Sequence, residues 1–330
     1  MKKSFPNIRM RRLRANNPIR NLVRENNLFK YDLIQPIFII DGKNKIEKIT
    51  SMPNIYRMSI DIAIKEIKAL HKIGLQGVAL FPCISERNKD NNGSESYNAD
   101  GLMQKAISHI KKAVKDIAII SDVALDPYTK HGQDGILDSK KNIVNDETVE
   151  ILVKQALSHA EAGADIVAPS DMMDGRIKAI RSSLEKNSFF DTKILSYAVK
   201  YSSNFYGPFR DAVKSSKNIG RANKDTYQMD YGNESESIRE VELDLSEGAD
   251  IIMVKPGMPY LDIIKKINDQ FNVPIFAYQV SGEYAMIKAV SQKNWLDEKK
   301  IVMESLLSMK RAGANAILTY FAKDVLAWLK

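Results

Sequence analysis

The stretch Ala249-Asp250-Ile251-Ile252-Met253-Val254-Lys255-Pro256-Gly257 has the pattern of a buried parallel strand that ends on a lysine. Its apolar run, 251–254, is bounded by Gly248 on one side and by Pro256-Gly257 on the other. Continuous apolar runs, as opposed to alternating ones, are typical of strands that are covered on both faces. The stretch therefore predicts a parallel sheet with helices around it, and it places an ammonium group at the end of one strand.

Similar apolar segments recur along the chain with helical patterns between them. Two of these helices are expected over 60–73 and 149–162, and each is followed by a glycine, the usual residue at a helix end. Eight predicted strands that alternate with helices favour a (β/α)8 TIM barrel over an open doubly wound sheet. The first strand is not followed by Gly-x-Gly-x-x-Gly, which argues against dinucleotide binding. The predicted strands are 33–40, 77–82, 117–124, 165–169, 193–199, 249–254, 274–280 and 315–320.

The first 31 residues have no sustained apolar period and are rich in arginine. We expect residues 1–31 to form an arm that is either disordered or ordered by a neighbouring subunit, with residues 32–330 forming the barrel. The cluster Arg9–Arg14 and the net charge of +8 are compatible with nucleic-acid binding. Because the charge is otherwise dispersed and no aromatic residues interleave with the cluster, we expect an oligomer contact and no nucleic-acid partner.

Composition sets the class and the expected compartment. With 330 residues, 44% of them hydrophobic and 27% charged, the chain is that of an ordinary globular protein. No apolar run reaches the roughly 18 residues that a membrane span needs, and Met1–Pro6 lacks the apolar core of a signal peptide. The single cysteine, Cys83, cannot form a disulfide framework, so the sequence predicts a cytoplasmic protein with no membrane partner.

A second predicted strand, 193–199, runs into another lysine, Lys200. A buried ammonium is costly unless it is paired or loses its proton, and a neutral lysine amine attacks carbonyl carbons to form a Schiff base. If Lys200 and Lys255 lie on adjacent strands, each lowers the pKa of the other. They would then hold one carbonyl substrate each, or divide nucleophile and base roles. The alternative is that each is a surface lysine paired with a carboxylate.

Further polar residues follow the predicted strands, where a TIM barrel has its active site. Arg210 and Lys224 would suit a carboxylate substrate, and Ser281 and Tyr320 are neutral donors for a second carboxylate. The residues that we expect on this rim are Asp122, Asp126, Asp134, Ser170, Tyr206, Arg210, Tyr278, Ser281 and Tyr320. Their convergence on one rim predicts an enzyme.

The segment after the third strand carries three of these carboxylates. Asp122 and Asp126 would share one face if the strand continued that far, and Gly132 and Gly135 would let the following loop move as a lid. Together with Asp134 they form an oxygen-rich set that suits Mg²⁺ and not zinc. The alternative is a solvated acidic loop.

Six segments carry a resemblance to a known family: 122–128, 131–135, 168–176, 205–210, 253–260 and 278–284. On these segments the sequence resembles the porphobilinogen synthase (delta-aminolevulinate dehydratase) family, from about residue 9 to the end. The resemblance implies a TIM barrel whose arm embraces a neighbour, a homo-octamer built from dimers, and no organic cofactor. It also implies condensation of two delta-aminolevulinate molecules into porphobilinogen, with loss of two waters, on the route to haem.

By this resemblance Lys255 and Lys200 each form a Schiff base, with the propionate-side and the acetate-side substrate respectively. Arg210, Lys224 and Gln228 match residues that hold the acetate-side substrate. The remaining matches are Ser281 and Tyr320 at the propionate-side carboxylate, Asp122 and Ser170 near its amino group, and Tyr206 and Tyr278 at the substrate.

The chain departs from the zinc-dependent members of the family. Those members carry three cysteines where this chain has Ala124, Asp126 and Asp134, so no catalytic zinc is expected. The sequence resembles the aspartate-rich, magnesium-responsive branch, in which a regulatory Mg²⁺ lies between subunits on a glutamate that matches Glu240. The rival interpretation is a class I aldolase, another Schiff-base barrel that needs only one catalytic lysine.

Overall fold

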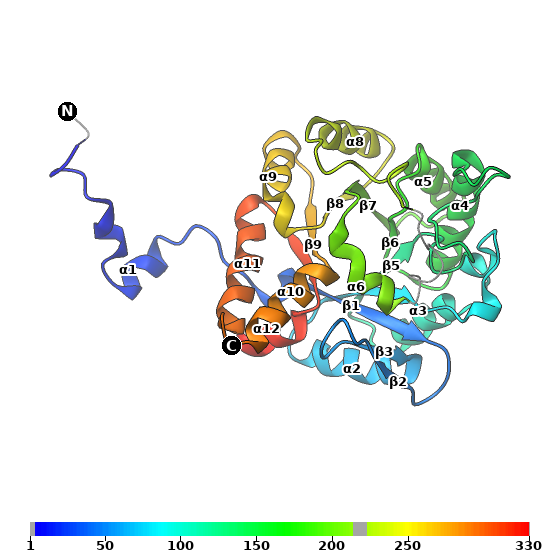
Figure 1. The fold of residues 1–330 in the computed structure, drawn as a ribbon, viewed down its shortest axis with the longest axis horizontal. Helices are drawn as coiled ribbons and strands as arrows, with labels where there is room; N and C mark the ends of the chain where they lie inside the picture. The colour runs from blue at the N-terminus through cyan, green and yellow to red at the C-terminus, as the bar shows by residue number, and fades with distance from the viewer. Residues whose placement is uncertain (1–3, 214–222, 330) are drawn as a thin grey trace.

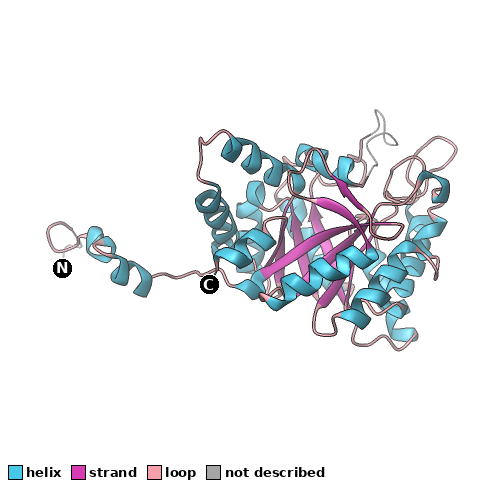
Figure 2. Cartoon of the chain, turned by 90° about the horizontal axis from the view of Figure 1, so that it is seen from below, coloured by secondary structure: helices cyan, strands magenta, loops and turns pink. Residues whose placement is uncertain are grey.

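The computed structural model describes residues 4–213 and 223–329, and it contains a closed barrel of eight parallel strands surrounded by helices (Figures 1 and 2). The barrel closes where β10 pairs with β1. The predicted (β/α)8 TIM barrel is confirmed, and each predicted strand overlaps an observed one. The barrel strands are β1 (Leu33–Ile40), β4 (Gly77–Pro82), β5 (Ala118–Val123), β6 (Ile166–Pro169), β7 (Lys193–Lys200), β8 (Ile251–Lys255), β9 (Ile275–Gln279) and β10 (Ala316–Thr319).

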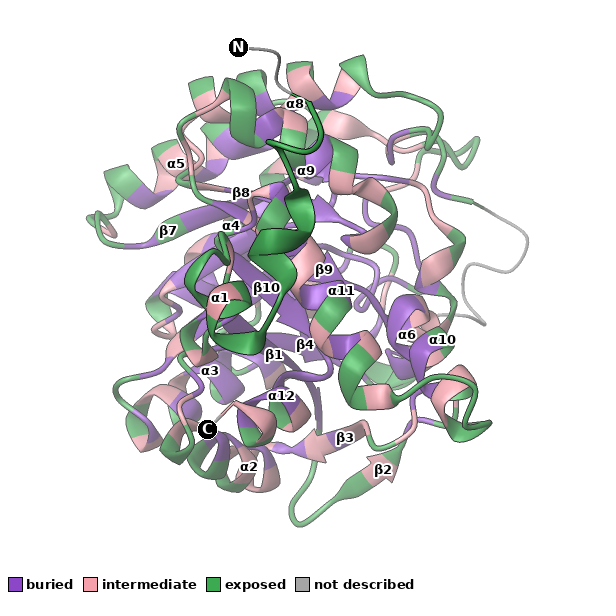
Figure 3. Ribbon diagram, turned by 90° about the vertical axis from the view of Figure 1, so that its left-hand side faces the viewer, coloured by how far each residue is buried: buried purple, intermediate pink, exposed green. Residues whose placement is uncertain are grey.

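Helices cover the outside of the barrel, so the strands are buried on both faces (Figure 3). The helix predicted over 60–73 is confirmed as α2, whereas α4 begins at Asn145, earlier than predicted. Asp146 and Glu147 in its first turn favour this earlier start because they face the positive end of the helix dipole. The helices are α2 (Ile60–Lys72), α3 (Leu102–Ala113), α4 (Asn145–Glu161), α5 (Arg176–Lys186), α6 (Gly207–Ala212), α8 (Ser235–Ser246), α9 (Leu261–Gln270), α10 (Ser281–Gln292), α11 (Glu298–Ala312) and α12 (Ala322–Trp328).

A hairpin that the sequence did not predict extends the end of β1. It consists of β2 (Ile46–Lys48) and β3 (Tyr56–Ser59), and β3 runs parallel to β1. Arg57 in β3 is buried, and its guanidinium donates to the carbonyl oxygens of Asp211 and Ala212, at 2.6 and 2.5 Å. The hairpin therefore ties β1 to the end of α6 at the carboxyl rim of the barrel.

The N-terminal segment extends away from the barrel (Figure 1). It carries the short helices η1 (Met10–Arg14) and α1 (Asn17–Leu22), and its apolar side chains Phe5, Met10 and Leu22 are 72%, 64% and 80% exposed. Residues 1–3 of the predicted arm lie outside the described residues. Among the residues described, no helix combines the length and apolar character that crossing a membrane would require.

Glycine ends the helix at three helix-to-strand joints. Gly163, Gly248 and Gly313 have φ angles of +102°, +107° and +123°, in the region that side-chain-bearing residues rarely adopt. At each joint this conformation reverses the chain from a covering helix into the next strand. The glycines that the sequence places at these joints are therefore required by backbone geometry.

We expect Gly313→Ala to lower the free energy of unfolding by about 1–3 kcal/mol, because alanine must adopt a strained backbone there. Its Cβ would also lie 2.5 Å from the Asn268 side chain. Gly207→Ala is the matched control, since a Cβ there meets nothing within 4 Å. Denaturant unfolding of both variants measures the difference. Equal stability of the two variants would contradict this account of the joint.

Candidate active site

The two predicted lysines lie opposite each other at the carboxyl ends of neighbouring strands. Lys200 in β7 is the register partner of Lys255 in β8. Their side chains are inside the barrel, where the residues are 5% and 6% exposed. The alternative of two surface lysines is therefore wrong, and the expectation of two amines side by side on adjacent strands is confirmed by the register.

The amine of Lys255 is enclosed by aromatic rings. Its Nζ lies 5.2 Å from the ring centre of Tyr197, 5.1 Å from Tyr206, 5.3 Å from Phe209 and 4.8 Å from Tyr278. Burial, followed by the nearby ammonium of Lys200, lowers the pKa of Lys255 to about 7, against the opposing effect of nearby carboxylates. A large share of Lys255 is therefore the neutral, nucleophilic amine at physiological pH.

Lys200 and Lys224 are held by carboxylates. The Lys200 amine donates to the carbonyl oxygen of Ser170 and lies 3.3 Å from an oxygen of Asp134. Lys224 lies 2.6 Å from the other oxygen of Asp134 and 3.3 Å from Asp126. Burial favours a lower pKa for Lys224, but these two carboxylates outweigh it and raise the pKa above its ordinary value. Lys224 is thus a fixed cation.

Asp126 and Asp134 respond differently to this pairing. Burial raises the pKa of Asp126, whereas Lys200 and Lys224 outweigh burial at Asp134 and lower its pKa. Both residues are buried, so the alternative of a solvated acidic loop is wrong. Across 4–213 and 223–329, no three residues among His, Cys, Asp and Glu are grouped to hold a metal ion. In this arrangement ammonium groups pair with Asp126 and Asp134, two members of the predicted Mg²⁺ set, and metal binding by the set stays a prediction.

Asp122 is the carboxyl group that is able to exchange a proton beside Lys255. It lies near the end of β5, and burial raises its pKa to about 6, with Lys255 opposing the shift and Asp126 adding to it. The Ser170 hydroxyl bonds to it and also lowers its pKa. A buried carboxyl that titrates near neutral pH is suited to general acid–base catalysis. The strand itself ends at Val123, three residues before Asp126, so it does not continue far enough for Asp122 and Asp126 to share a strand face.

The neutral donors lie on the same side of the barrel and are bonded to one another or to the backbone. The hydroxyl groups of Tyr278 and Tyr320 are 2.9 Å apart. The Ser281 hydroxyl accepts from the Phe209 N–H at 2.9 Å. The Tyr206 hydroxyl lies 2.8 Å from the carbonyl oxygen of Tyr201 and 3.2 Å from that of Lys255. These bonds fix the walls of the site around the Lys255 amine.

Arg210 and Gln228 flank Lys200, Lys224 and Lys255, which together form the lysine cluster. Arg210 is half-buried in α6, and its charge acts on the nearby Tyr206. Gln228 is buried, and its backbone N–H donates to the backbone carbonyl oxygen of Lys224 at 2.9 Å. The structure thus brings the predicted substrate-binding residues to one end of the barrel, while their contacts with substrate stay predictions.

Glu240 lies apart from the lysine cluster, on α8. Burial raises its pKa to about 7; Asp244, Asp174 and Glu236 add to the shift, and Arg176 opposes it. Glu240 and Gln228 both line a cavity of about 830 Å³, which is bounded by residues of 133–145 and 223–240. The predicted regulatory position, Glu240, is therefore outside the lysine cluster but borders the loops that carry Lys224 and Asp134.

Sequence reasoning missed Tyr197 and Phe209, which form part of the aromatic enclosure. Tyr197 lies in β7, three residues before Lys200, and Phe209 lies in α6. The available signal was the concentration of aromatic residues close to the strand ends. Gly135, assigned to lid motion, instead permits close packing, because a Cβ there would lie 2.8 Å from the Thr148 hydroxyl.

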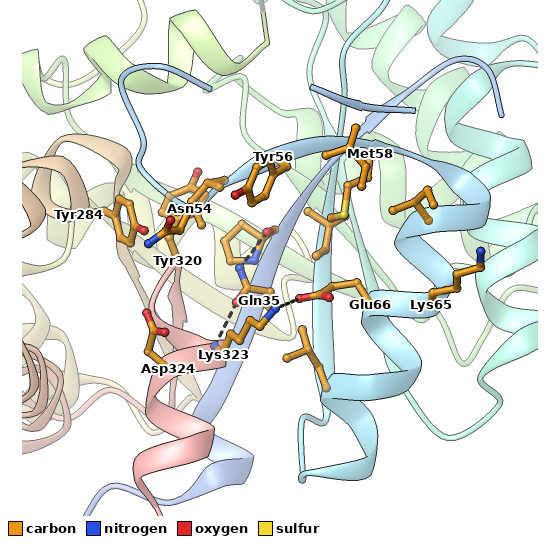
Figure 4. Close-up of a pocket in the computed structure, with 16 residues that line it drawn as sticks. Gln35, Asn54, Tyr56, Met58, Lys65, Glu66, Tyr284, Tyr320, Lys323 and Asp324 are labelled. Carbon is orange, nitrogen blue, oxygen red and sulfur yellow. Dashed lines mark hydrogen bonds and ion pairs between the residues drawn. The ribbon is translucent and has the colours of Figure 1, made fainter. Parts of the chain in front are cut away.

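A separate cavity of about 740 Å³ lies between β1, β3, α2 and α12 (Figure 4). Of the predicted site residues, only Tyr320 lines it. The Lys323–Glu66 ion pair and Gln35 cross one side of it. The predicted chemistry is therefore inside the barrel, and this cavity is on the outer side of β1.

The arrangement combines a nucleophilic amine, a second lysine and a carboxyl group that titrates near neutral pH. An amine of this kind adds to a ketone carbon, and loss of water gives an imine. The nearby carboxyl is able to supply and remove the protons that these steps require. The site is thus chemically suited to Schiff-base catalysis on small keto acids.

Comparison with known proteins gives consistent matches over nearly the whole chain. A family model described as delta-aminolevulinic acid dehydratase matches residues 7–328. A delta-aminolevulinic acid dehydratase of Bradyrhizobium diazoefficiens is 53% identical over 315 residues, covering 96% of this chain and 89% of the relative. One of Methanothermus sociabilis is 54% identical over 321 residues, covering 97% and 98%.

A solved structure is also similar. The crystal structure of delta-aminolevulinic acid dehydratase (porphobilinogen synthase) from Toxoplasma gondii, in complex with the reaction product porphobilinogen, matches with a TM-score of 0.95. Its sequence identity to this chain is 48%, and the match covers 97% of this chain and 91% of that one.

We expect imine formation at Lys255 to follow the free amine. With a pKa of about 7, the neutral fraction rises about fivefold between pH 6 and pH 7 and levels off above pH 8. The measurement is borohydride trapping of a small keto acid, quantified on the Lys255 peptide by mass spectrometry at each pH. Asp122→Asn should move the midpoint to lower pH, because it removes a carboxylate that raises this pKa. A midpoint above pH 9 in the unaltered protein would contradict the assignment.

Proposed function

The chain belongs to the delta-aminolevulinic acid dehydratase family, and from this premise we infer that it condenses two delta-aminolevulinate molecules into porphobilinogen, with loss of two waters. It is accordingly a lyase of porphyrin biosynthesis. The observation that carries the inference for this chain is the buried pair Lys200 and Lys255 on adjacent strands. Two amines side by side match a reaction that joins two ketones.

We assign one ketone to each lysine. The Lys255 amine, whose pKa is lowered to about 7, adds to the first ketone, and loss of water gives an iminium ion. Lys200 forms the second iminium ion after transferring its proton. An iminium ion acidifies the neighbouring carbon, so one substrate becomes an enamine and attacks the other. The amino group of the propionate-side substrate then adds to the imine carbon held by Lys200 and displaces that lysine as its free amine, which closes the ring. Loss of a proton from the carbon beside the new carbon–carbon bond expels Lys255, and a final proton shift gives the pyrrole, with Asp122 carrying protons beside Lys255.

The substrate carboxylates are assigned to opposite sides of the lysine pair. Arg210, Lys224 and Gln228 would bind the acetate-side substrate, and the fixed positive charge of Lys224 supports this role. Ser281 and Tyr320 would bind the propionate-side carboxylate. Ser170 would contact its amino group, and the rings of Tyr206 and Tyr278 beside Lys255 would enclose its carbon chain.

The class I aldolase alternative needs a single Schiff-base lysine. In an aldolase reaction Lys200, the register partner of Lys255, would have no chemical role. Yet Lys200 occupies a buried position, which is costly for a cation. The two-lysine reaction uses both residues, and we therefore prefer it.

We further propose a regulatory Mg²⁺ at Glu240, as in the aspartate-rich branch of the family. Glu240, Glu236 and Asp174 line one cavity and raise one another's affinity for positive charge. Oxygen ligands of this kind suit Mg²⁺, which retains several waters and therefore needs only one or two protein carboxylates. The ion would supply positive charge beside α8, outside the lysine cluster, and we expect no catalytic zinc.

The N-terminal segment supports self-association. Its apolar residues Phe5, Met10, Leu13 and Leu22 are exposed in the single chain, although apolar groups gain stability when they are covered. We propose that this arm packs against a neighbouring copy in a homo-octamer built from dimers. We also keep the cytoplasm as the proposed compartment, which suits a chain whose single cysteine, Cys83, is buried.

We expect the purified protein to form porphobilinogen from delta-aminolevulinate, detected by its colour with an acidic aldehyde reagent. Lys255→Met and Lys200→Met should each reduce turnover by about 10³-fold or more, because each removes a covalent attachment point. Lys265→Met, an exposed lysine paired with Asp269, is the control and should retain activity.

Borohydride trapping in the presence of substrate distinguishes the two reactions. Adducts on both Lys200 and Lys255 are expected for the condensation, and an adduct on one lysine alone would favour the aldolase. Absence of porphobilinogen from a folded sample under every ion condition would overturn the proposed function.

We expect Mg²⁺ to raise activity relative to a chelator-treated sample, and Glu240→Gln to abolish this difference because it removes the charged ligand. Thermal unfolding with and without Mg²⁺ gives a second readout that does not depend on turnover. Glu242→Gln, an exposed neighbour on α8, should keep the response. An unchanged Mg²⁺ response in Glu240→Gln would exclude this residue as the ligand.

A further inference from the structure

The first turn of α10 lies between the two loops that follow the lysine-bearing strands. α10 packs beside α6 and the short helix η5 (Asn204–Tyr206), both in the chain that follows β7 (Figures 1 and 3). The Ser281 hydroxyl bonds the N–H of Phe209 at 2.9 Å and the carbonyl oxygen of Phe205 at 3.3 Å. A Cβ on Gly282 would lie 2.5 Å from that same carbonyl oxygen. Glycine at this position therefore allows the helix to approach the β7 loop closely.

Glu283 makes the corresponding connection to the loop that follows β8. It is fully buried, and one carboxylate oxygen accepts the Met258 N–H at 2.7 Å. The other oxygen accepts the Val280 N–H at 2.5 Å. Met258 lies three residues after Lys255, and Val280 is the residue that caps α10. One side chain thus joins the segment beyond the reactive lysine to the start of the helix that carries Ser281.

The bond to Val280 alone is an ordinary helix-capping contact. The bond to Met258 is different because it crosses to another loop. Burial raises the pKa of Glu283 to about 8, and bonds from the backbone N–H groups of Val280, Met258 and Gly257 oppose the shift. Burial of an ionisable group is costly. The buried carboxyl is held by bonds to two different loops, one of which lies outside the helix that it caps.

We propose that Glu283 is a positioning residue that fixes the separation between the Lys255 amine and the hydroxyl of Ser281. This inference rests on the proposed function, in which Lys255 binds the ketone and Ser281 the carboxylate of one substrate. A keto acid held at both ends must have a carbon chain that matches this separation. Glu283 therefore sets the chain length of the acid that Lys255 accepts.

The physical basis is that the two ends belong to different loops. Lys255 is anchored by β8, whereas Ser281 belongs to the start of α10 after β9. Without a direct connection between them, their separation would vary with small motions of either loop. The Glu283 carboxyl group provides that connection, because each of its two oxygens accepts a backbone N–H, one from Met258 and one from Val280. Rigid placement of two contacts is what turns a one-carbon difference in the ligand into a rate difference.

The experiment compares two probes of different length, 4-oxopentanoate and 5-oxohexanoate, by borohydride trapping on Lys255. Borohydride delivers hydride to the imine carbon, and the nitrogen keeps the resulting secondary amine. We expect the unaltered protein to favour the shorter acid, and Glu283→Gln to reduce the ratio of the two trapping rates by about tenfold, the range for one methylene. Glutamine keeps the size but turns an N–H₂ group toward a backbone N–H.

Glu283→Asp serves as the second variant in case the glutamine protein does not fold. The shorter carboxylate is still able to accept from Val280 but withdraws from Met258, so it removes the contact between loops and keeps the cap. It should show the same loss of length discrimination. Lys288→Met is the matched control, because it removes a buried cation of α10 that pairs with the half-buried Glu298 of α11. It should lower stability and leave the ratio unchanged.

The outcomes separate this inference from the proposed function. An unchanged ratio in folded Glu283→Gln or Glu283→Asp, with only a lower unfolding temperature, would overturn the positioning role and leave Glu283 as a helix cap. Adducts at Lys255 of the unaltered protein that clearly favour the shorter acid, with this preference retained in Lys288→Met and lost in both Glu283 variants, would support the positioning role. No adduct at Lys255 in the unaltered protein, with either acid, would overturn the proposed function and this inference with it.

Discussion

The burial of the Lys255 amine beside a second lysine is the constraint on which the rest of the site depends. An ammonium inside the barrel loses hydration, and the aromatic rings around Lys255 return only part of it. The opposing Lys200 adds repulsion, so the proton of Lys255 is held weakly. The barrel makes this possible because adjacent parallel strands end at the same rim and place their last side chains next to each other.

The surrounding elements hold this unfavourable arrangement in place. Arg57 in the β2–β3 hairpin holds the end of α6, and the first turn of α10 holds the loops after β7 and β8. These contacts are mostly hydrogen bonds to backbone groups. They restrain the loops that carry the reacting residues. Among the described residues, it is these contacts, and not an ion pair at Lys255 itself, that offset the free-energy cost of burying charged groups.

The sequence was sufficient for the barrel and for the two lysines, because continuous apolar runs and helix-ending glycines are local signals. It did not reveal the β2–β3 hairpin, whose short, partly exposed strands have no such run. The enclosure by Tyr197 and Phe209 was missed because it joins residues of a strand and a later helix. The suggested Mg²⁺ set at Asp122, Asp126 and Asp134 stays a prediction, and spacing alone did not show that Lys200 and Lys224 would pair with two of these carboxylates.

The pairing of Asp126 and Asp134 with lysines explains how one site contains both a charged lysine and a lysine with a lowered pKa. Asp126 and Asp134 raise the pKa of Lys224 and so preserve its charge, as the proposed binding of an anionic substrate requires. Burial and the ammonium of Lys200 instead lower the pKa of Lys255, whose amine lies among aromatic rings. The difference arises from which neighbours each amine meets, since burial acts on both in the same direction. The carboxylates in the segment after β5 therefore keep one lysine as a cation, while the other is available as the neutral amine that the proposed reaction needs.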